Sequence, residues 1–330
     1  MATAPPPVAH TLFRKQMLAK RGPIDNAGSI TASVNSNFDL GSTIFKSLPA
    51  KSLGRVFQNT KLDETIVWSE EVAAAIEADY TSLPKQVSSD DGIFKFMFEE
   101  CDFSIEHADG SFLDHLYFCR DYGALHYPEE SARVLLLHSI CGVGTNCFPM
   151  SVSKLPMLKT LLSLEEYCQI EAFPSILRLL VHGPLLAELL AAESTKLEYG
   201  LRAVRFRRLL DNEPLELSAD QLWKQLNFQL IHAMDFLPPA AWQRTGSTYF
   251  FHIFDSLHRL LTAQGKLGAK IDWSGFGSSK PLLEGARPNT WRHWLVDLVP
   301  SAVVLRLASK QIAKYSAAVG HSLEYELVWA

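Results

Sequence analysis

The chain has 330 residues, of which 47% are hydrophobic and 20% are charged, and its formal net charge is −5. This composition is typical of a folded protein and excludes a chain that is disordered throughout. Because 31 basic residues stand against 36 acidic ones, the sequence lacks the basic excess of a dedicated nucleic-acid-binding protein, and we expect no nucleic acid among its partners.

The N-terminal segment, residues 1–62, differs in composition from the rest of the chain. It is rich in Ser, Asn, Gly, Thr and Pro, and it holds too few apolar residues to form a core of its own. Its first 24 residues include no acidic side chain but do include Arg14, Lys15, Lys20 and Arg21, as organellar transit peptides do. Two interpretations stay open: a mitochondrial or other organellar targeting segment, or an extended cytoplasmic arm that binds other protein subunits.

Helical periodicity begins near residue 63 and predicts one all-α domain over 63–320, followed by a C-terminal tail over 321–330. Strand signals are weak, because alternating β-branched runs are few and no Asn-Gly or Asp-Gly hairpin separates them. A helix is also expected to start near Asp109 and to carry Phe112, Leu116 and Cys119 on one face. The other predicted helices cover 64–80, 131–140, 155–162, 175–192, 219–237, 249–263 and 291–319, the last broken at Pro300.

Two further features restrict the class of protein. The five cysteines are an odd number and form no C-x-x-C pair, which favours reduced thiols in an intracellular compartment. No apolar run reaches the ~18 residues that span a bilayer, so we predict no membrane span. A basic cluster, Arg202, Arg205, Arg207 and Arg208, is interpreted as a solvated helix face, with contact to an anionic partner as the alternative.

Two histidines lie in the densest apolar part of the sequence. His115 belongs to the helix expected after Asp109, and His138 lies near the end of a helix that is apolar almost all round. A buried imidazole needs a hydrogen-bond partner or a metal ion, because burying it unpaired costs free energy. The sequence leaves both possibilities open: satisfied core histidines, or ligands of a metal.

A third candidate ligand follows later in the chain. His232 and Asp235 are three residues apart on the helix expected over 219–237, so they share a face. With His115 and His138, Asp235 would complete a set of two histidines and one carboxylate, which suits Fe(II), with Mn or Zn as further options. His232 is the substitute for Asp235 in this set. The alternative is that Asp235 is a solvated or helix-capping carboxylate.

The stretch 110–149, with its two histidines, its buried helix and its glycine-rich exit, resembles the HD-domain superfamily. More closely, it resembles an HD-like branch in which the His-Asp doublet reads His-Ser, here His138-Ser139. The resemblance implies an all-helical bundle related to metal-dependent phosphohydrolases and to the diiron oxygenases of the myo-inositol oxygenase branch. By position it implies that His115, His138 and Asp235 are metal ligands. Ser139 departs from the family pattern, since the Asp of the doublet is itself a ligand.

Two functional hypotheses follow. The first is a pseudoenzyme with an HD-like domain and no cofactor, a scaffold or accessory subunit that binds other subunits through residues 1–62. It depends on Ser139 and on the incomplete ligand set. The second is a metal-dependent HD-like enzyme that uses Fe or Mn, either as a phosphohydrolase or as a non-haem iron oxygenase.

Overall fold

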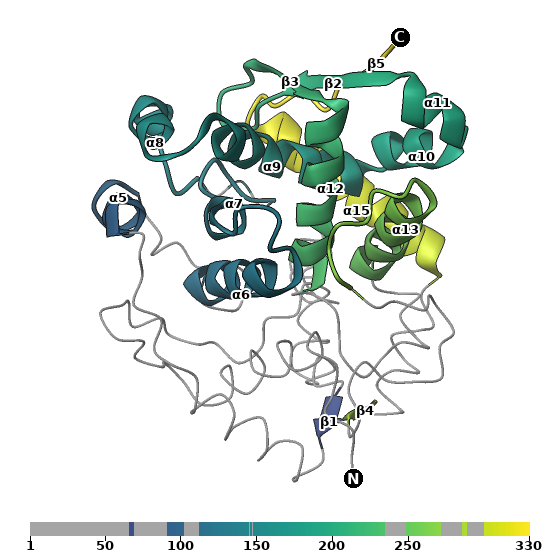
Figure 1. The fold of residues 1–330 in the computed structure, drawn as a ribbon, viewed down its shortest axis with the longest axis horizontal. Coiled ribbons are helices and arrows are strands. Elements are labelled where there is room, and N and C mark those ends of the chain that lie inside the picture. Colours follow the sequence, from purple (N-terminus) through teal and green to yellow (C-terminus); the bar gives the residue numbers. More distant parts are fainter. Residues whose placement is uncertain are drawn as a thin grey trace.

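The computed structural model describes residues 66–68, 91–101, 112–144, 146, 148–234, 249–271, 286–288 and 300–330. Within these residues the protein is mostly helical, with two small antiparallel sheets (Figure 1). The prediction of an all-α protein is therefore correct for the helices but wrong in excluding strands.

The helices begin and end close to the predicted positions in several places. The ten described α-helices are α5 (Asp91–Glu100), α6 (Phe112–His126), α7 (Arg133–Leu137), α8 (Leu155–Leu161), α9 (Leu164–His182), α10 (Pro184–Ala191), α11 (Ser194–Tyr199), α12 (Ala219–Met234), α13 (Tyr249–Ala263) and α15 (Ser301–Ala318). The predictions for α6, α7, α8, α12, α13 and α15 are confirmed over these bounds. The N-terminal arm (1–62) and residues 291–299 lie outside the described residues.

The helix predicted over 175–192 is wrong at its start and in its continuity. α9 begins at Leu164 because Ser163 caps it: the Ser163 hydroxyl accepts from the Glu166 amide, and the Glu166 carboxylate accepts from the Ser163 amide. The helix ends at Gly183, whose φ of 104° is a conformation that glycine adopts readily. Pro184 then starts α10 as a separate helix.

Helix α12 is the central element of the bundle. Its side chains are buried on every side from Gln225 to Ala233, and α6, α7, α9 and α13 pack around it. In Figure 1 it runs from the three-stranded sheet at the top toward α6 below. A helix enclosed in this way brings residues from several distant segments of the chain to one place.

The three-stranded sheet consists of β2 (Leu201–Arg207), β3 (Pro214–Ser218) and β5 (Glu326–Trp329), with β2 in the middle. In β2, buried Val204 and Phe206 alternate with exposed Arg205. The Arg205 side chain pairs with Glu216 on β3 and with Glu326 on β5. The basic cluster, predicted to be a helix face, is therefore mostly on a strand, where Arg205 and Arg207 are two residues apart and point away from the core.

Two further predictions are corrected by strands. Residues 321–330, expected to be a tail, include β5, which pairs with β2 and buries Leu327. Within the helix expected over 64–80, Ile66–Trp68 form strand β1, which pairs with β4 (Ala286–Pro288). Both pairings join segments more than a hundred residues apart, which local periodicity does not reveal.

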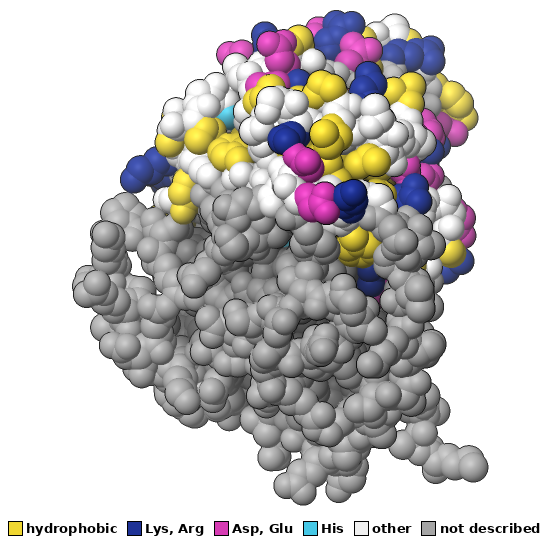
Figure 2. All heavy atoms as spheres, turned by 90° about the vertical axis from the view of Figure 1, so that its left-hand side faces the viewer, with side chains coloured by type: hydrophobic (Ala, Val, Ile, Leu, Met, Phe, Trp, Pro, Cys, Tyr) yellow, Lys and Arg dark blue, Asp and Glu magenta, His cyan; other side chains and the backbone are white. Residues whose placement is uncertain are grey.

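The described surface carries charges of both signs. On the face that includes α5 and α8, Figure 2 shows Lys and Arg side chains beside Asp and Glu, with hydrophobic side chains between them. Among the described helices, no single one is both long and apolar enough to cross a membrane. Only α9 and α10 taken together meet that length and composition, and they are bent by 77° relative to one another.

Candidate metal centre

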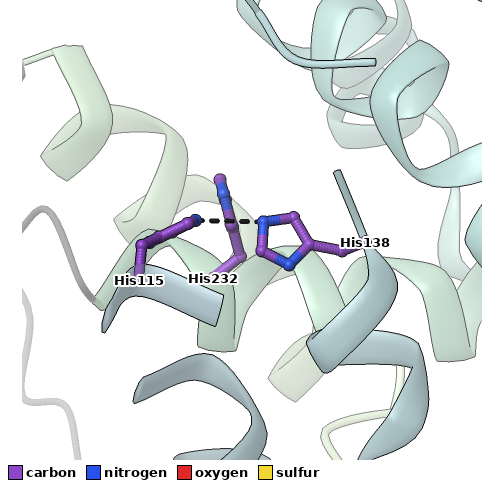
Figure 3. Close-up of side chains that lie close together, drawn as sticks. All are labelled: His115, His138 and His232. Carbon is purple, nitrogen blue, oxygen red and sulfur yellow. Dashed lines mark hydrogen bonds between the residues drawn. The ribbon is translucent and has the colours of Figure 1, made fainter. Parts of the chain in front are cut away.

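Three histidines from three different segments meet in the interior of the bundle (Figure 3). His115 comes from α6, His138 directly follows α7, and His232 lies in the last turn of α12. The three side chains are 2%, 1% and 4% exposed, respectively. One ring nitrogen from each lies within 4.8 Å of the other two. We call these three residues the histidine triad.

The local sequence explains how α6 and α7 bring two of these histidines together. The two helices are consecutive and joined by a short loop, so they pack side by side. They approach closely at Gly123, where a Cβ atom would lie 2.4 Å from Leu135 Cδ1. Leu135 is one turn before His138, so this contact fixes the position from which His138 extends. The predicted approach of His115 and His138 is confirmed.

The geometry of the triad suits a single bound ion. His115 Nε2 and His138 Nε2 are 3.0 Å apart. Nitrogen ligands of one Zn²⁺ ion, each about 2.0–2.1 Å from the metal, are about 2.8–3.0 Å apart at an angle of 90° and about 3.3–3.4 Å apart at the tetrahedral angle, so this pair is at the short end of the range. The ring centroids are 4.7–5.0 Å apart and the ring planes cross at 70–81°. The three rings therefore lie against one another at steep angles, with one nitrogen of each within 4.8 Å of the others.

His138 is already oriented as a ligand. Its Nδ1 lies 2.6 Å from the carbonyl oxygen of Leu135. A carbonyl oxygen can only accept, so Nδ1 carries the proton, and Nε2 of the neutral ring has its lone pair directed toward the triad. Metal-bound histidines commonly donate their second N–H to a backbone carbonyl in this manner.

The hydrogen bonds of His115 follow from those of His138. Because His138 Nε2 accepts, His115 Nε2 donates to it, and His115 Nδ1 then accepts from the thiol of Cys119, whose Sγ is 3.8 Å away. A bound ion would replace the proton at His115 Nε2. The proton would move to Nδ1, where the Cys119 sulfur is a weak acceptor. The same side chains therefore provide partners for both a metal-free and a metal-bound state.

Apolar groups enclose the triad. The Phe173 ring of α9 packs against His138 and His232, with centroid distances of 4.8 and 5.3 Å. Leu116 and Cys119, beside His115 on α6, are fully buried. An environment of this kind strengthens the interaction between an ion and its ligands, because few water molecules compete with it.

The triad consists of three of the four residues named as candidate ligands from the sequence. His115 and His138 are brought together as expected, and the third member is His232, the substitute. Asp235 lies outside the described residues. Cys119 and Phe173 were not predicted to belong to the site, although the four-residue spacing from His115 to Cys119 on one helix face was visible in the sequence.

Comparison of the chain with family models, with curated proteins and with solved structures finds no match. The case for a function therefore depends on the triad and its surroundings.

Proposed function

We propose that this protein is metal-dependent and that His115, His138 and His232 hold one divalent transition-metal ion at the centre of the bundle. The observation that carries the proposal is the convergence of three buried imidazoles whose ligand atoms lie within 4.8 Å of one another. Each buried imidazole costs free energy unless its polar atoms are satisfied. A metal ion satisfies three of them at once, and it explains why three polar rings share one site in an apolar core.

The ligand type favours some ions over others. Neutral imidazoles suit Zn²⁺, Co²⁺ and Fe²⁺, whereas Mg²⁺ and Ca²⁺ prefer oxygen ligands. Three histidines with one further position for water form the ligand set of a catalytic zinc site. Fe or Mn, which the sequence suggested, becomes the better choice if the carboxylate of Asp235 joins the three histidines.

The chemistry that such a site supports is the activation of water. An ion held by three neutral ligands would keep its full positive charge and would lower the pKa of a bound water far below that of bulk water, to about 7. The role of the chain is to hold the ligands in place: the Leu135 carbonyl orients His138, Cys119 lies beside His115, and Phe173 packs against the rings of His138 and His232. We therefore favour hydrolysis over a purely structural site.

The relation to HD-like proteins belongs to the same proposal. It is supported by the positions of His115 and His138, which are the two histidines that the resemblance assigns to the metal, and by the helices that carry them. The scaffold hypothesis, with subunits bound through residues 1–62, stays a prediction.

The decisive measurement is the metal content of protein purified without chelators. We expect elemental analysis to find a stoichiometric transition metal, most readily zinc or iron. After its removal, Co²⁺ should bind and give the visible absorption of cobalt with nitrogen ligands. His138→Gln and His232→Gln should each lower the affinity for Co²⁺ by at least about 100-fold, the upper range seen when even outer-shell partners of a site are removed.

A matched control lies on the same helix as one of the ligands. His126 is a buried histidine on α6, 5% exposed and eleven residues from His115, so it is about 16 Å away along the helix axis. His126→Gln should therefore leave Co²⁺ affinity unchanged, whereas His115→Gln should reduce it. If the purified protein contains no metal and also fails to bind Co²⁺, the proposal is wrong, and the triad is a hydrogen-bonded part of the core.

A further inference from the structure

A line of glutamine side chains lies between α9 and α12. Gln221, Gln225 and Gln229 are four residues apart on α12, so they share one face of that helix, and His232 lies on the same face. The Gln221 carbonyl accepts from Gln169 Nε2 at 3.1 Å, and Gln229 Nε2 donates to the Phe173 carbonyl at 3.0 Å. Both partners belong to α9. Gln225, midway between the two contacts, therefore also faces α9.

The inner amides of this line are buried without sufficient partners. Gln225 is 0% exposed, and neither Oε1 nor Nε2 has a hydrogen-bond partner among the described residues. The Oε1 atoms of Gln169 and Gln229 are likewise buried and lack a partner within the described part of the chain. Unpaired buried amides are rare in native proteins, and each requires an explanation.

Asn227, on the same helix, shows how an amide is normally buried. Its Nδ2 donates to the carbonyls of Trp223 and Lys266, and its Oδ1 accepts from the amides of Gly268 and Ala269. The bundle is therefore able to satisfy a buried amide with protein groups. It does so at Asn227, whereas Gln225 has no such partner in the described part of the chain.

The two ends of the line have different surroundings. At the inner end, Gln229 bonds to the backbone of Phe173, whose ring contacts two members of the triad. At the outer end, the Glu165 carboxylate accepts from Gln169 at 3.2 Å and from Gln221 at 2.9 Å. Lys224 joins Glu165 to Glu130 and Asp220 there. Three carboxylates around one ammonium leave a net negative charge that attracts cations.

We propose that Gln169, Gln225 and Gln229 bind a file of water molecules, and that this file is the route by which water and the metal ion reach the triad. Water can both donate and accept, so it can satisfy the amide atoms that have no partner among the described residues. Neutral amides are suited to line a path for a cation, because they replace part of its hydration shell but bind it less strongly than carboxylates do. The route to the metal rests on the proposed metal site, whereas the water file itself does not.

The test uses the full chain and replaces the central amide by an apolar side chain of similar length. In Gln225→Met, the rates at which Co²⁺ binds and dissociates, followed by stopped-flow absorption, should both fall at least about tenfold, with Kd nearly unchanged because no ligand is lost. Leu226→Met is the matched control. It changes a fully buried neighbour on α12 by a volume-conserving substitution, and the rates should stay at their original values.

A second readout does not depend on the metal. If Gln225 is hydrated, the methionine displaces bound water and leaves the denaturation midpoint unchanged or lower. If the amide is dry and unpaired, the same substitution raises the midpoint, because an unsatisfied polar group has been removed. A raised midpoint would overturn the water file, and unchanged Co²⁺ rates in Gln225→Met would overturn the route. Failure of the unsubstituted protein to bind Co²⁺ would overturn both the proposed function and the route. The denaturation midpoint of Gln225→Met would still show whether water molecules are bound at Gln225.

Discussion

Arg178 shows how a single buried charge organises this bundle. The side chain is completely buried, and no described carboxylate forms an ion pair with it. Its guanidinium donates to Asn146 Oδ1 at 2.6 Å, to the Val143 carbonyl at 3.0 Å and to Ser316 Oγ at 3.1 Å. It thereby ties α9 to the loop after α7 and to α15. Burial lowers the pKa of Arg178 to about 10, so the group remains charged at neutral pH.

We expect Arg178→Met to lower the free energy of unfolding by about 2–4 kcal/mol, because several acceptors of a charged donor lose their partner, partly offset by the removal of a buried charge. Arg178→Lys should restore only part of the stability, since one ammonium group does not reproduce the planar fork of the guanidinium. Urea denaturation checks both variants. Equal stability of Arg178→Met and the parent protein would contradict this role.

His321 makes the stability depend on pH. Burial lowers the pKa of His321 below 6.5, and the nearby charge of Arg178 lowers it further, while the hydrogen bond to the Arg207 carbonyl opposes both. As pH falls below 6.5, the unfolded chain therefore binds a proton that the folded chain does not bind. Stability is fully present above pH 6.5 and is lost as pH falls below it, by at most about 1.4 kcal/mol per pH unit for one group.

His321→Gln should therefore reduce the slope of stability against pH between 6.5 and 5, measured by urea denaturation at several pH values. The slope should not vanish, because burial also lowers the pKa of His126 and of His182. An unchanged slope would show that His321 does not titrate differently in the two states.

At the scale of elements, the contact between α6 and α7 positions two of the three histidines. A Cβ atom at Gly123 would lie 2.4 Å from Leu135 Cδ1, and the carbonyl of Leu135 holds His138. We expect Gly123→Ala to destabilise the protein by about 1–3 kcal/mol through overpacking, despite the better helix propensity of alanine. Displacement of Leu135 should also move His138 and weaken Co²⁺ binding.

Gly92→Ala on α5 is the matched control for this prediction. A Cβ atom there would meet nothing closer than Leu161 Cδ2 at 3.8 Å, an ordinary contact. The substitution should stabilise the protein by up to about 1 kcal/mol and leave Co²⁺ affinity unchanged. If both glycine variants behave alike in thermal denaturation and Co²⁺ titration, the close approach of α6 and α7 is not what positions the site.

At the scale of the whole molecule, the C-terminal strand closes the sheet. β5 pairs with β2 and buries Leu327, and the Ala330 amide donates to the Gly200 carbonyl. Truncation after Gly320 would leave β2 as an edge strand with unpaired backbone groups. We expect a lower Tm and increased aggregation, seen by calorimetry and light scattering.

The variant Glu326→Gln is the control that tests the charge of β5 apart from its backbone pairing. It keeps β5 in place and removes only the exposed ion pair with Arg205. Exposed ion pairs contribute about 0–1 kcal/mol to the free energy of unfolding. The Tm of this variant should stay close to that of the parent protein. A truncated chain as stable as the parent would mean that β5 is dispensable for the sheet.

Some of this structure was determined by local sequence alone. The bounds of α13 and the positions of α6 and α8 follow from the spacing of apolar residues, because burial of one helix face imposes a period near 3.6. The approach of His115 to His138 follows too, since consecutive helices joined by a short loop pack against each other. These features depend on residues close together in the chain.

Tertiary structure decided the rest. His232 is distant in sequence from His138, and its place in the triad depends on how α12 packs among the other helices. β5 pairs with β2 although more than a hundred residues separate them. Gln225 lacks a hydrogen-bond partner among the described residues, which depends on the groups of α9 that it faces. Periodicity records that a side chain is buried but not what it is buried against, so partners from distant segments are decided only when the bundle is assembled.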